Sequence, residues 1–288
     1  GIFGIYSKDT SLTNRTISEE VYKFYRISPT LTFHLNKKTP RHPIERRLVL
    51  RHVSVLRTQT ECPPNTNCSR KPDNFYLNEL AFICRNNKRI NPMGWSVTMQ
   101  QGNNFALAQA EVKYLLSYGK SAGSGLNARF YGAAFLQNNT LSGTNPVLLP
   151  LTMRGGYDYA LDQIFVGRNE TQGMWSRQVG MGGAGFKVPL NIGYTDAYML
   201  ALNLKASIPN LKLPIKIYGD IAVPYTDKAD AGLWSGKTFF DSGIAFTLVP
   251  DVFEVYWSLL SSQNLQDVYE VNGFKWYERF SFLINFKS

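Results

Sequence analysis

The sequence predicts an all-β protein, a transmembrane antiparallel β-barrel of about 12 strands that occupies residues 1–288 as a single domain. The main observation is a period of two in side-chain polarity, because successive side chains of a strand point to opposite sides of a sheet. A second observation is that long and short connections alternate along the chain. A third is the 14% share of aromatic residues, since aromatic side chains form belts at both surfaces of a bilayer.

Seven strands are expected in the first half of the chain. The second of them alternates clearly, and Pro29 predicts a bulge within it because proline cannot donate to a sheet ladder. The residues Gln-Gly-Asn-Asn at 101–104 predict a tight hairpin, since glycine and asparagine tolerate positive φ. The stretch that follows has helix-forming residues, but the spacing of Glu111 and Lys113 favours a strand. The seven strands lie at about residues 1–6, 22–36, 46–57, 75–85, 95–100, 108–116 and 126–136.

Five further strands are expected in the last third of the chain, where the alternation is strongest. In the first of them Leu200 and Leu202 lie on the face opposite Asn203. In the closing strand Phe280 and Phe282 oppose polar neighbours. The apolar face of each strand is therefore expected to meet lipid, and the polar face the inside of the barrel. These strands lie at about residues 198–208, 213–223, 241–249, 253–259 and 275–286.

The connections between the strands sort by length. With the C-terminus in the periplasm, the short connections fall on the periplasmic side and the long ones fall outside, except for the hairpin at 101–104. This asymmetry is typical of bacterial outer-membrane barrels, so both termini are expected in the periplasm. A soluble β-sandwich, which stays the alternative fold, gives no reason for such sorting. The short connections are 37–45, 88–93, 118–125, 209–213 and 250–251, and the long ones are 8–21, 59–74, 138–195, 225–237 and 262–274.

Residues 138–195 interrupt the alternation and are rich in glycine and asparagine. A loop of this length is uncommon in a compact domain and is usually functional. We expect it to be a long external loop or a plug inside the barrel.

Charged residues on the polar faces are expected to line the lumen. Most often such residues form ion pairs with one another, and their charges then cancel. Less often, carboxylates crowded together in a lumen are catalytic, and these carboxylates are the one candidate for catalysis in this chain. The predicted luminal residues are Glu111, Arg129, Lys205, Lys216, Asp220, Asp241, Glu254 and Arg279.

Composition limits the chemistry and the partners. The net charge is +10, and many basic residues lie between strands, which suits contact with outer-membrane lipid and lipopolysaccharide better than a nucleic-acid groove. No His-Glu-x-x-His, Gly-x-Ser-x-Gly or P-loop motif is present, so no catalytic residue, metal or cofactor is predicted for this chain. Cys62 and Cys68 lie in a polar loop and are expected either to close a small disulfide or to be free thiols.

The second half of the chain resembles a known family. The segments MRGGYDYALDQIFVGRNETQGMWSRQVGMGGAGFKV, YMLALNLKASIP, LPIKIYGDIAVP and KWYERFSFLINF are similar to the C-terminal part of Bacteroidota aminopeptidase-N-like zinc metallopeptidases. The resemblance covers about residues 150–286, and no catalytic residue can be carried over because the zinc motif is missing. The residues that match the loop pattern of this family are Gly167, Arg168, Gln178, Gly182, Gly183, Phe186 and Lys187.

The resemblance implies an outer-membrane barrel that follows a gluzincin catalytic region. The chain is then the membrane anchor of a larger surface or periplasmic metallopeptidase, or a component of an outer-membrane complex. The first residue, Gly1, fits a chain that begins within a longer protein. The expected partners are therefore a peptidase domain or other outer-membrane subunits. A porin-like channel for small solutes is the alternative function.

Overall fold

The computed structural model describes residues 2–8, 20–36, 43–61, 69–72, 74–118, 124–141, 146–168, 170, 173–190, 192–209, 213–226, 237–249 and 252–285. Most of these residues lie in one large and mostly antiparallel sheet, with few helices. The predicted all-β class is therefore confirmed. Cys62 and Cys68 lie outside the described residues.

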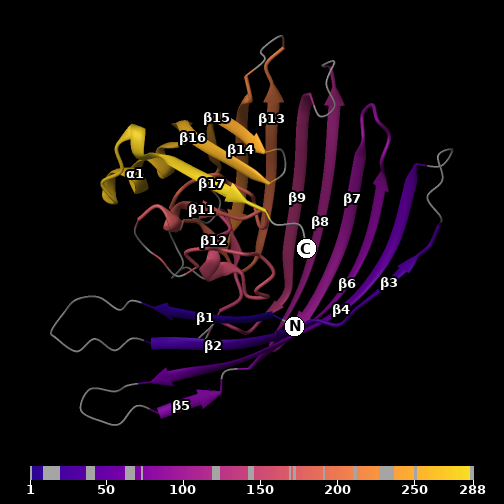
Figure 1. Ribbon diagram of the computed structural model, residues 1–288, viewed down its shortest axis with the longest axis vertical. Coiled ribbons are helices and arrows are strands. Elements are labelled where there is room, and N and C mark those ends of the chain that lie inside the picture. The colour runs from indigo at the N-terminus through magenta and orange to yellow at the C-terminus, as the bar shows by residue number, and fades with distance from the viewer. Residues whose placement is uncertain are drawn as a thin grey trace.

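The main sheet is a meander in which twelve antiparallel strands follow one another in chain order (Figure 1). Two short strands pair only with β4: β3 (Thr30–His34) and β5 (Ser69–Pro72). The twelve strands are β1 (Ile2–Lys8), β2 (Glu20–Ile27), β4 (Ile44–Glu61), β6 (Phe75–Asn86), β7 (Met93–Gly102), β8 (Phe105–Ser117), β9 (Gly125–Asn138), β13 (Tyr198–Ser207), β14 (Ile215–Tyr225), β15 (Phe239–Val249), β16 (Phe253–Ser261) and β17 (Phe280–Ile284).

Local sequence signals account for several of these elements. Pro29 separates β2 from β3, and both strands pair with β4, so together they form one interrupted strand. Asn104, in the hairpin between β7 and β8, has a φ of 61°, the left-handed conformation that asparagine tolerates. The stretch that contains Glu111 is strand β8, as its alternation predicted.

Among the described residues the sheet does not close into a barrel. Its path begins at β1, which pairs with β2 only, and ends at β11 (Gln178–Val179), which pairs with β17 in parallel. The free edge of the last strand is therefore taken by a piece of the long connection between β9 and β13. Sequence alternation could not predict this pairing, because β11 is only two residues long.

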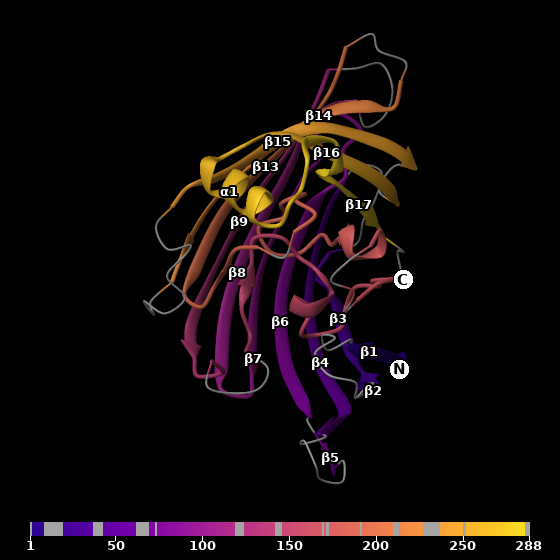
Figure 2. The same cartoon turned by 90° about the vertical axis from the view of Figure 1, so that its left-hand side faces the viewer.

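The described part of the long connection between β9 and β13 lies on the concave side of the sheet, as Figures 1 and 2 show from two directions. We call the described residues between 146 and 195 the inner segment. Besides β11 it contains β10 (Leu149–Pro150), which pairs with β12 (Tyr194–Thr195), and two short 3-10 helices. Its apolar side chains form one core with the inward residues of the strands. The members contributed by the inner segment include Leu149, Leu151, Ala184, Phe186, Val188, Leu190 and Ile192.

Two expectations at the C-terminal end were wrong. The connection 262–274 was expected to be a loop, but it contains helix α1 (Gln263–Val271), which buries Leu265 and Tyr269 in the core. Phe282 was expected to face lipid, but it is only 2% exposed. The rings of Trp175 and Phe253 cover it, because β11 brings the inner segment beside β17. No helix in the described part of the chain is both long enough and apolar enough to cross a membrane.

Candidate functional site

The outer face of the sheet carries large exposed apolar side chains. On β13, Leu200 is 47% exposed whereas its neighbour Met199 is buried, and on β14 Ile217 is 55% exposed whereas Tyr218 is buried. The same alternation recurs on neighbouring strands. The exposed outer residues include Leu31, Phe33, Leu50, Leu80, Trp95, Val97, Met99, Tyr114, Leu116, Phe130, Leu136, Tyr198, Leu200, Ile217, Ile221, Tyr225, Phe240, Leu248 and Leu259.

The outer apolar face is larger than soluble monomers usually show. It extends over ten neighbouring strands, which at about 4.8 Å per strand and a height of about 20 Å gives on the order of 900 Å². The largest apolar patch of a typical soluble monomer is about 300–600 Å². A contiguous apolar face of this size is typical of a surface that a partner or a membrane covers.

The ends of the outer apolar face are marked by aromatic and polar residues. On β13 and β14 the row of outward apolar residues ends at Tyr198 and Tyr225, whose rings stack with centroids 4.8 Å apart. From Tyr198 to Ile208 these residues cover about 33 Å of strand. On β4, β6 and β7 the row ends at a ladder of side-chain hydrogen bonds between His52, Asn78 and Gln101.

The inner face of the sheet is lined by paired polar side chains. Arg129 Nε donates to Glu111 Oε1 at 2.5 Å, and its Nη1 donates to Asn203 Oδ1 at 2.8 Å. Lys205 Nζ lies 2.7 Å from Glu254 Oε1. The structure thus joins four of the predicted luminal charges into two ion pairs, Glu111 with Arg129 and Lys205 with Glu254.

The remaining predicted luminal residues also lie on inward positions. Asp241 accepts hydrogen bonds from the Tyr218 hydroxyl at 2.8 Å and from Ser261 Oγ at 2.9 Å. Its cross-strand neighbour Asp220 accepts one from Asn203 Nδ2 at 2.8 Å. Arg279 lies over the Tyr269 ring at 4.4 Å. Lys216 follows the inward register of β14, close enough to Glu254 to interact electrostatically.

Arg168 makes several hydrogen bonds within the inner segment. Its guanidinium donates to the Gly155 carbonyl at 3.0 Å, to Asp158 Oδ2 at 3.0 Å and to the Gln163 carbonyl at 2.5 Å. Asp158 in turn accepts from the backbone N–H groups of Asp162 and Gln163. One buried ion pair therefore folds the stretch from Gly155 to Arg168 back on itself.

The other family-pattern residues also hold the inner segment together. Gln178 donates to the Ile164 carbonyl at 2.7 Å and accepts from the Val166 N–H. Gly183 has a φ of 60°, and a Cβ there would lie 2.4 Å from the Pro150 carbonyl oxygen, so only glycine fits. The remaining members of the pattern are Gly167, which lies against Trp175, Gly182, which lies against Met153, Phe186, which is fully buried, and Lys187.

Burial shifts the pKa values of titratable groups in the inner segment. Burial lowers the pKa of Lys187 and the nearby carboxylate of Asp220 opposes this shift. Burial raises the pKa of the Asp158 carboxyl, while Arg168 acts in the opposite direction. Burial and the neighbouring Tyr194 raise the pKa of Tyr157 to about 12.

The inner segment connects the two ends of the sheet. Towards β2 and β4, Asp162 binds Arg26 and Arg51, and Arg26 Nε also donates to the Ala160 carbonyl at 2.8 Å. Towards β17, Arg177 Nη1 donates to the Glu278 carbonyl at 2.7 Å. These contacts were not predicted from the sequence. Arg26 and Arg51 lie on the inward register of their strands, but nothing in the non-periodic inner segment marked Asp162 as their partner.

We expect Asp162→Asn to loosen the inner segment at the N-terminal strands. The charge-assisted hydrogen bonds to Arg26 and Arg51 weaken, at a cost of about 1–2 kcal/mol once the exposure of Asp162 is taken into account. The measurement is amide hydrogen exchange, which should become faster in residues 158–165 and leave β14 to β16 unchanged. Asp267→Asn, at an exposed carboxylate on α1, is the matched control, and equal acceleration in both variants would contradict the assignment.

Two cavities lie between the inner segment and strands β7 to β9. The first, which we call the Tyr159 cavity, has a volume of about 140 Å³ and is lined by Gln100, Tyr157 and Tyr159, among others. The second, the Arg129 cavity, has a volume of about 190 Å³ and is lined by Ser96, Thr98, Glu111 and Arg129, among others. Both are lined by Gln109, Tyr131, Gly182 and Gly183.

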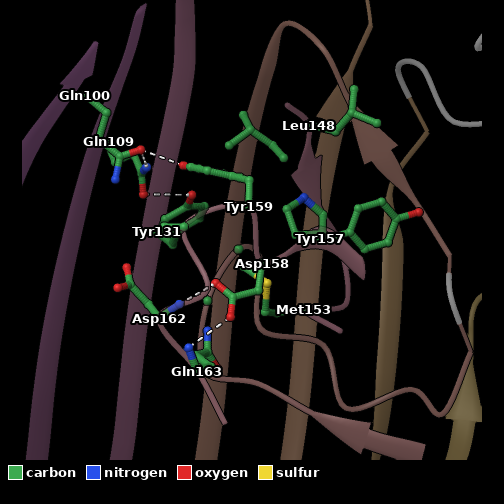
Figure 3. Close-up of a pocket in the computed structure, with 15 residues that line it drawn as sticks. Gln100, Gln109, Tyr131, Leu148, Met153, Tyr157, Asp158, Tyr159, Asp162 and Gln163 are labelled. Carbon is green, nitrogen blue, oxygen red and sulfur yellow. Dashed lines mark hydrogen bonds between the residues drawn. The ribbon is translucent and has the colours of Figure 1, made fainter. Parts of the chain in front are cut away.

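A chain of hydrogen bonds runs along the wall of the Tyr159 cavity (Figure 3). The Tyr131 hydroxyl donates to Gln109 Oε1 at 3.3 Å, Gln109 Nε2 donates to Gln100 Oε1 at 3.3 Å, and the Tyr159 hydroxyl donates to the same oxygen at 2.5 Å. Gln100 Nε2 continues the chain to Glu79. The wall of this cavity is therefore polar on the sheet side.

Within the described part of the chain, no three His, Cys, Asp or Glu side chains come close enough together to hold a metal ion. Cys84 is a free thiol on β6. A comparison with models of protein families finds none that matches this chain, and a search of curated proteins finds no significant match.

Proposed function

We propose that this chain is an outer-membrane β-barrel module that anchors a larger surface or periplasmic protein and carries its own plug. The observation on which this rests is the outer apolar face, which covers ten neighbouring strands while polar side chains and the inner segment occupy the concave side. In water this arrangement would expose the apolar face. In a bilayer the same face is solvated by lipid.

Closure of the sheet in the membrane is part of this proposal. Backbone N–H and C=O groups have no partners in hydrocarbon, so an open sheet edge is unfavourable there. The inner segment already binds β2 and β4 through Asp162 and pairs with β17 through β11. It therefore bridges the two ends of the sheet that a closed barrel would bring together.

The packing of the inner segment favours an anchor over an open channel. Leu151, Phe186 and Val188 are fully buried against inward residues of the strands. A dry core of this kind leaves little room for a water-filled pore. The resemblance to the C-terminal part of aminopeptidase-N-like zinc metallopeptidases makes a peptidase region the candidate for what is anchored, in the outer membrane of a Bacteroidota bacterium.

Reconstitution into lipid vesicles tests the membrane assignment. We expect the chain to stay with the vesicles after alkaline carbonate extraction and to give no steady current in a planar bilayer. Solubility without detergent would contradict the membrane location, and a steady current would favour the porin-like channel. The mass and N-terminal sequence of the native protein test the anchor, since a start far upstream of Gly1 is expected for a larger peptidase.

A further inference from the structure

The two cavities beside Tyr131 share part of their lining. Gln109 and Tyr131 of the sheet and Gly182 and Gly183 of the inner segment line both of them. Tyr131 is held in place by its hydrogen bond to Gln109 and by Arg129, which lies 4.9 Å from the centre of its ring. Both glycines pack against other parts of the inner segment, because a Cβ at Gly182 would meet Met153 and one at Gly183 would meet the Pro150 carbonyl.

The lining excludes most classes of ligand. Arg129 already binds Glu111, Asn203 and the Gly183 carbonyl, so it has little capacity left for an anion. Glu111 is bound by Arg129 and by Lys113, so it does not attract a cation. Gln100 and Gln109 each donate one hydrogen bond within the protein, so an apolar ligand would leave the second N–H of each amide unpaired, which is costly.

A neutral ligand with several hydroxyl groups matches this lining. Glutamine amides and tyrosine hydroxyls each supply donors and acceptors, and so does every hydroxyl of a polyol. The Tyr159 cavity has room for roughly five water molecules, enough for a three-carbon polyol. A six-carbon polyol needs the Arg129 cavity as well.

We propose that the paired cavities are a binding site for a small neutral polyol, whose chain passes between Tyr131 and Gly182. Gln100, Gln109, Tyr131 and Tyr159 bind its hydroxyls in the Tyr159 cavity, and Ser96 and Thr98 bind them in the Arg129 cavity. The site belongs to the folded chain and does not depend on what the module anchors.

Titration of the folded, detergent-solubilised chain with glycerol, xylitol and sorbitol, followed by saturation-transfer NMR, tests the proposal. We expect saturable binding that becomes tighter from glycerol to sorbitol. Gln109→Leu removes two hydrogen-bonding groups at the junction of the cavities and should weaken sorbitol binding at least tenfold. Gln137→Leu, the same change at an exposed position of β9, should leave the affinity unchanged.

A second variant separates the two cavities. Ser96→Phe fills the Arg129 cavity, so it should abolish the advantage of sorbitol over glycerol and leave glycerol binding intact. Absence of polyol binding to the folded wild-type chain would overturn the proposal. So would unchanged sorbitol affinity in both Gln109→Leu and Ser96→Phe, or tighter binding of inorganic phosphate than of sorbitol that Gln109→Leu abolishes.

Discussion

Ile221→Arg is expected to lower the free energy of unfolding by about 2–4 kcal/mol in phospholipid vesicles, because in the proposed membrane-spanning arrangement it places a charge near the middle of the bilayer. Ile221 lies on the outer face of β14, opposite Leu202 of β13, and is 45% exposed. It is four residues from Tyr225, and Tyr225 lies at the aromatic end of the outer apolar face. In a soluble protein a substitution at so exposed a position would usually change stability by less than about 0.5 kcal/mol.

The matched control is Tyr225→Arg, which also introduces an arginine but at the end of the outer apolar face. Near a bilayer surface an arginine costs only about 0–1 kcal/mol. Urea unfolding of both variants, followed by tryptophan fluorescence in vesicles, should therefore give a large penalty at position 221 and a small one at position 225. Equal penalties at the two positions, or a neutral Ile221→Arg, would show that the outer face does not lie in lipid.

The sheet could be predicted from the sequence because its signal is local. A lipid-facing or core-facing strand must alternate, so Leu200 and Met199 reveal their two faces within two residues. Pro29 and Asn104 mark an interruption and a turn for reasons of backbone geometry alone. The same alternation put Glu111 and Arg129 on one face, and the structure brings the two side chains into contact.

The inner segment could not be predicted, because its structure depends on contacts between distant residues. Asp162 binds an arginine 136 positions away in the sequence, and β11 pairs with a strand about a hundred residues later. Neither contact leaves a periodic pattern. Helix α1 did leave one, since Leu265, Val268 and Tyr269 have helical spacing, but at nine residues it is shorter than the helices that periodicity alone can identify.

Arg168→Met is expected to unfold the first half of the inner segment while the sheet remains folded. The Arg168 side chain is 12% exposed and that of Asp158 is 5% exposed. Removing one partner of a buried ion pair leaves the other charge without compensation, which costs about 3–5 kcal/mol. Amide hydrogen exchange should therefore become much faster in residues 155–168 and change little in β13 to β15.

The penalty of Arg168→Met should depend on pH. Burial already raises the pKa of Asp158 above its ordinary value of 3.8, against the opposing effect of Arg168. A carboxyl whose pKa is raised in the folded state binds its proton more tightly there, so its contribution to stability is present at low pH and is lost as the pH rises through the folded pKa. Without Arg168 the folded pKa of Asp158 rises further, which widens this window.

Arg168→Met should therefore be less destabilising near pH 4 than near pH 8, because a protonated Asp158 needs no counter-charge. Arg89→Met, at an exposed arginine between β6 and β7, removes a charge without breaking a buried pair and should have no such pH dependence. A penalty that is the same at both pH values would mean that Arg168 acts through its hydrogen bonds to the Gly155 and Gln163 carbonyls rather than through Asp158. In that case the inner segment depends on the geometry of the guanidinium, and Arg168→Lys should be as harmful as Arg168→Met.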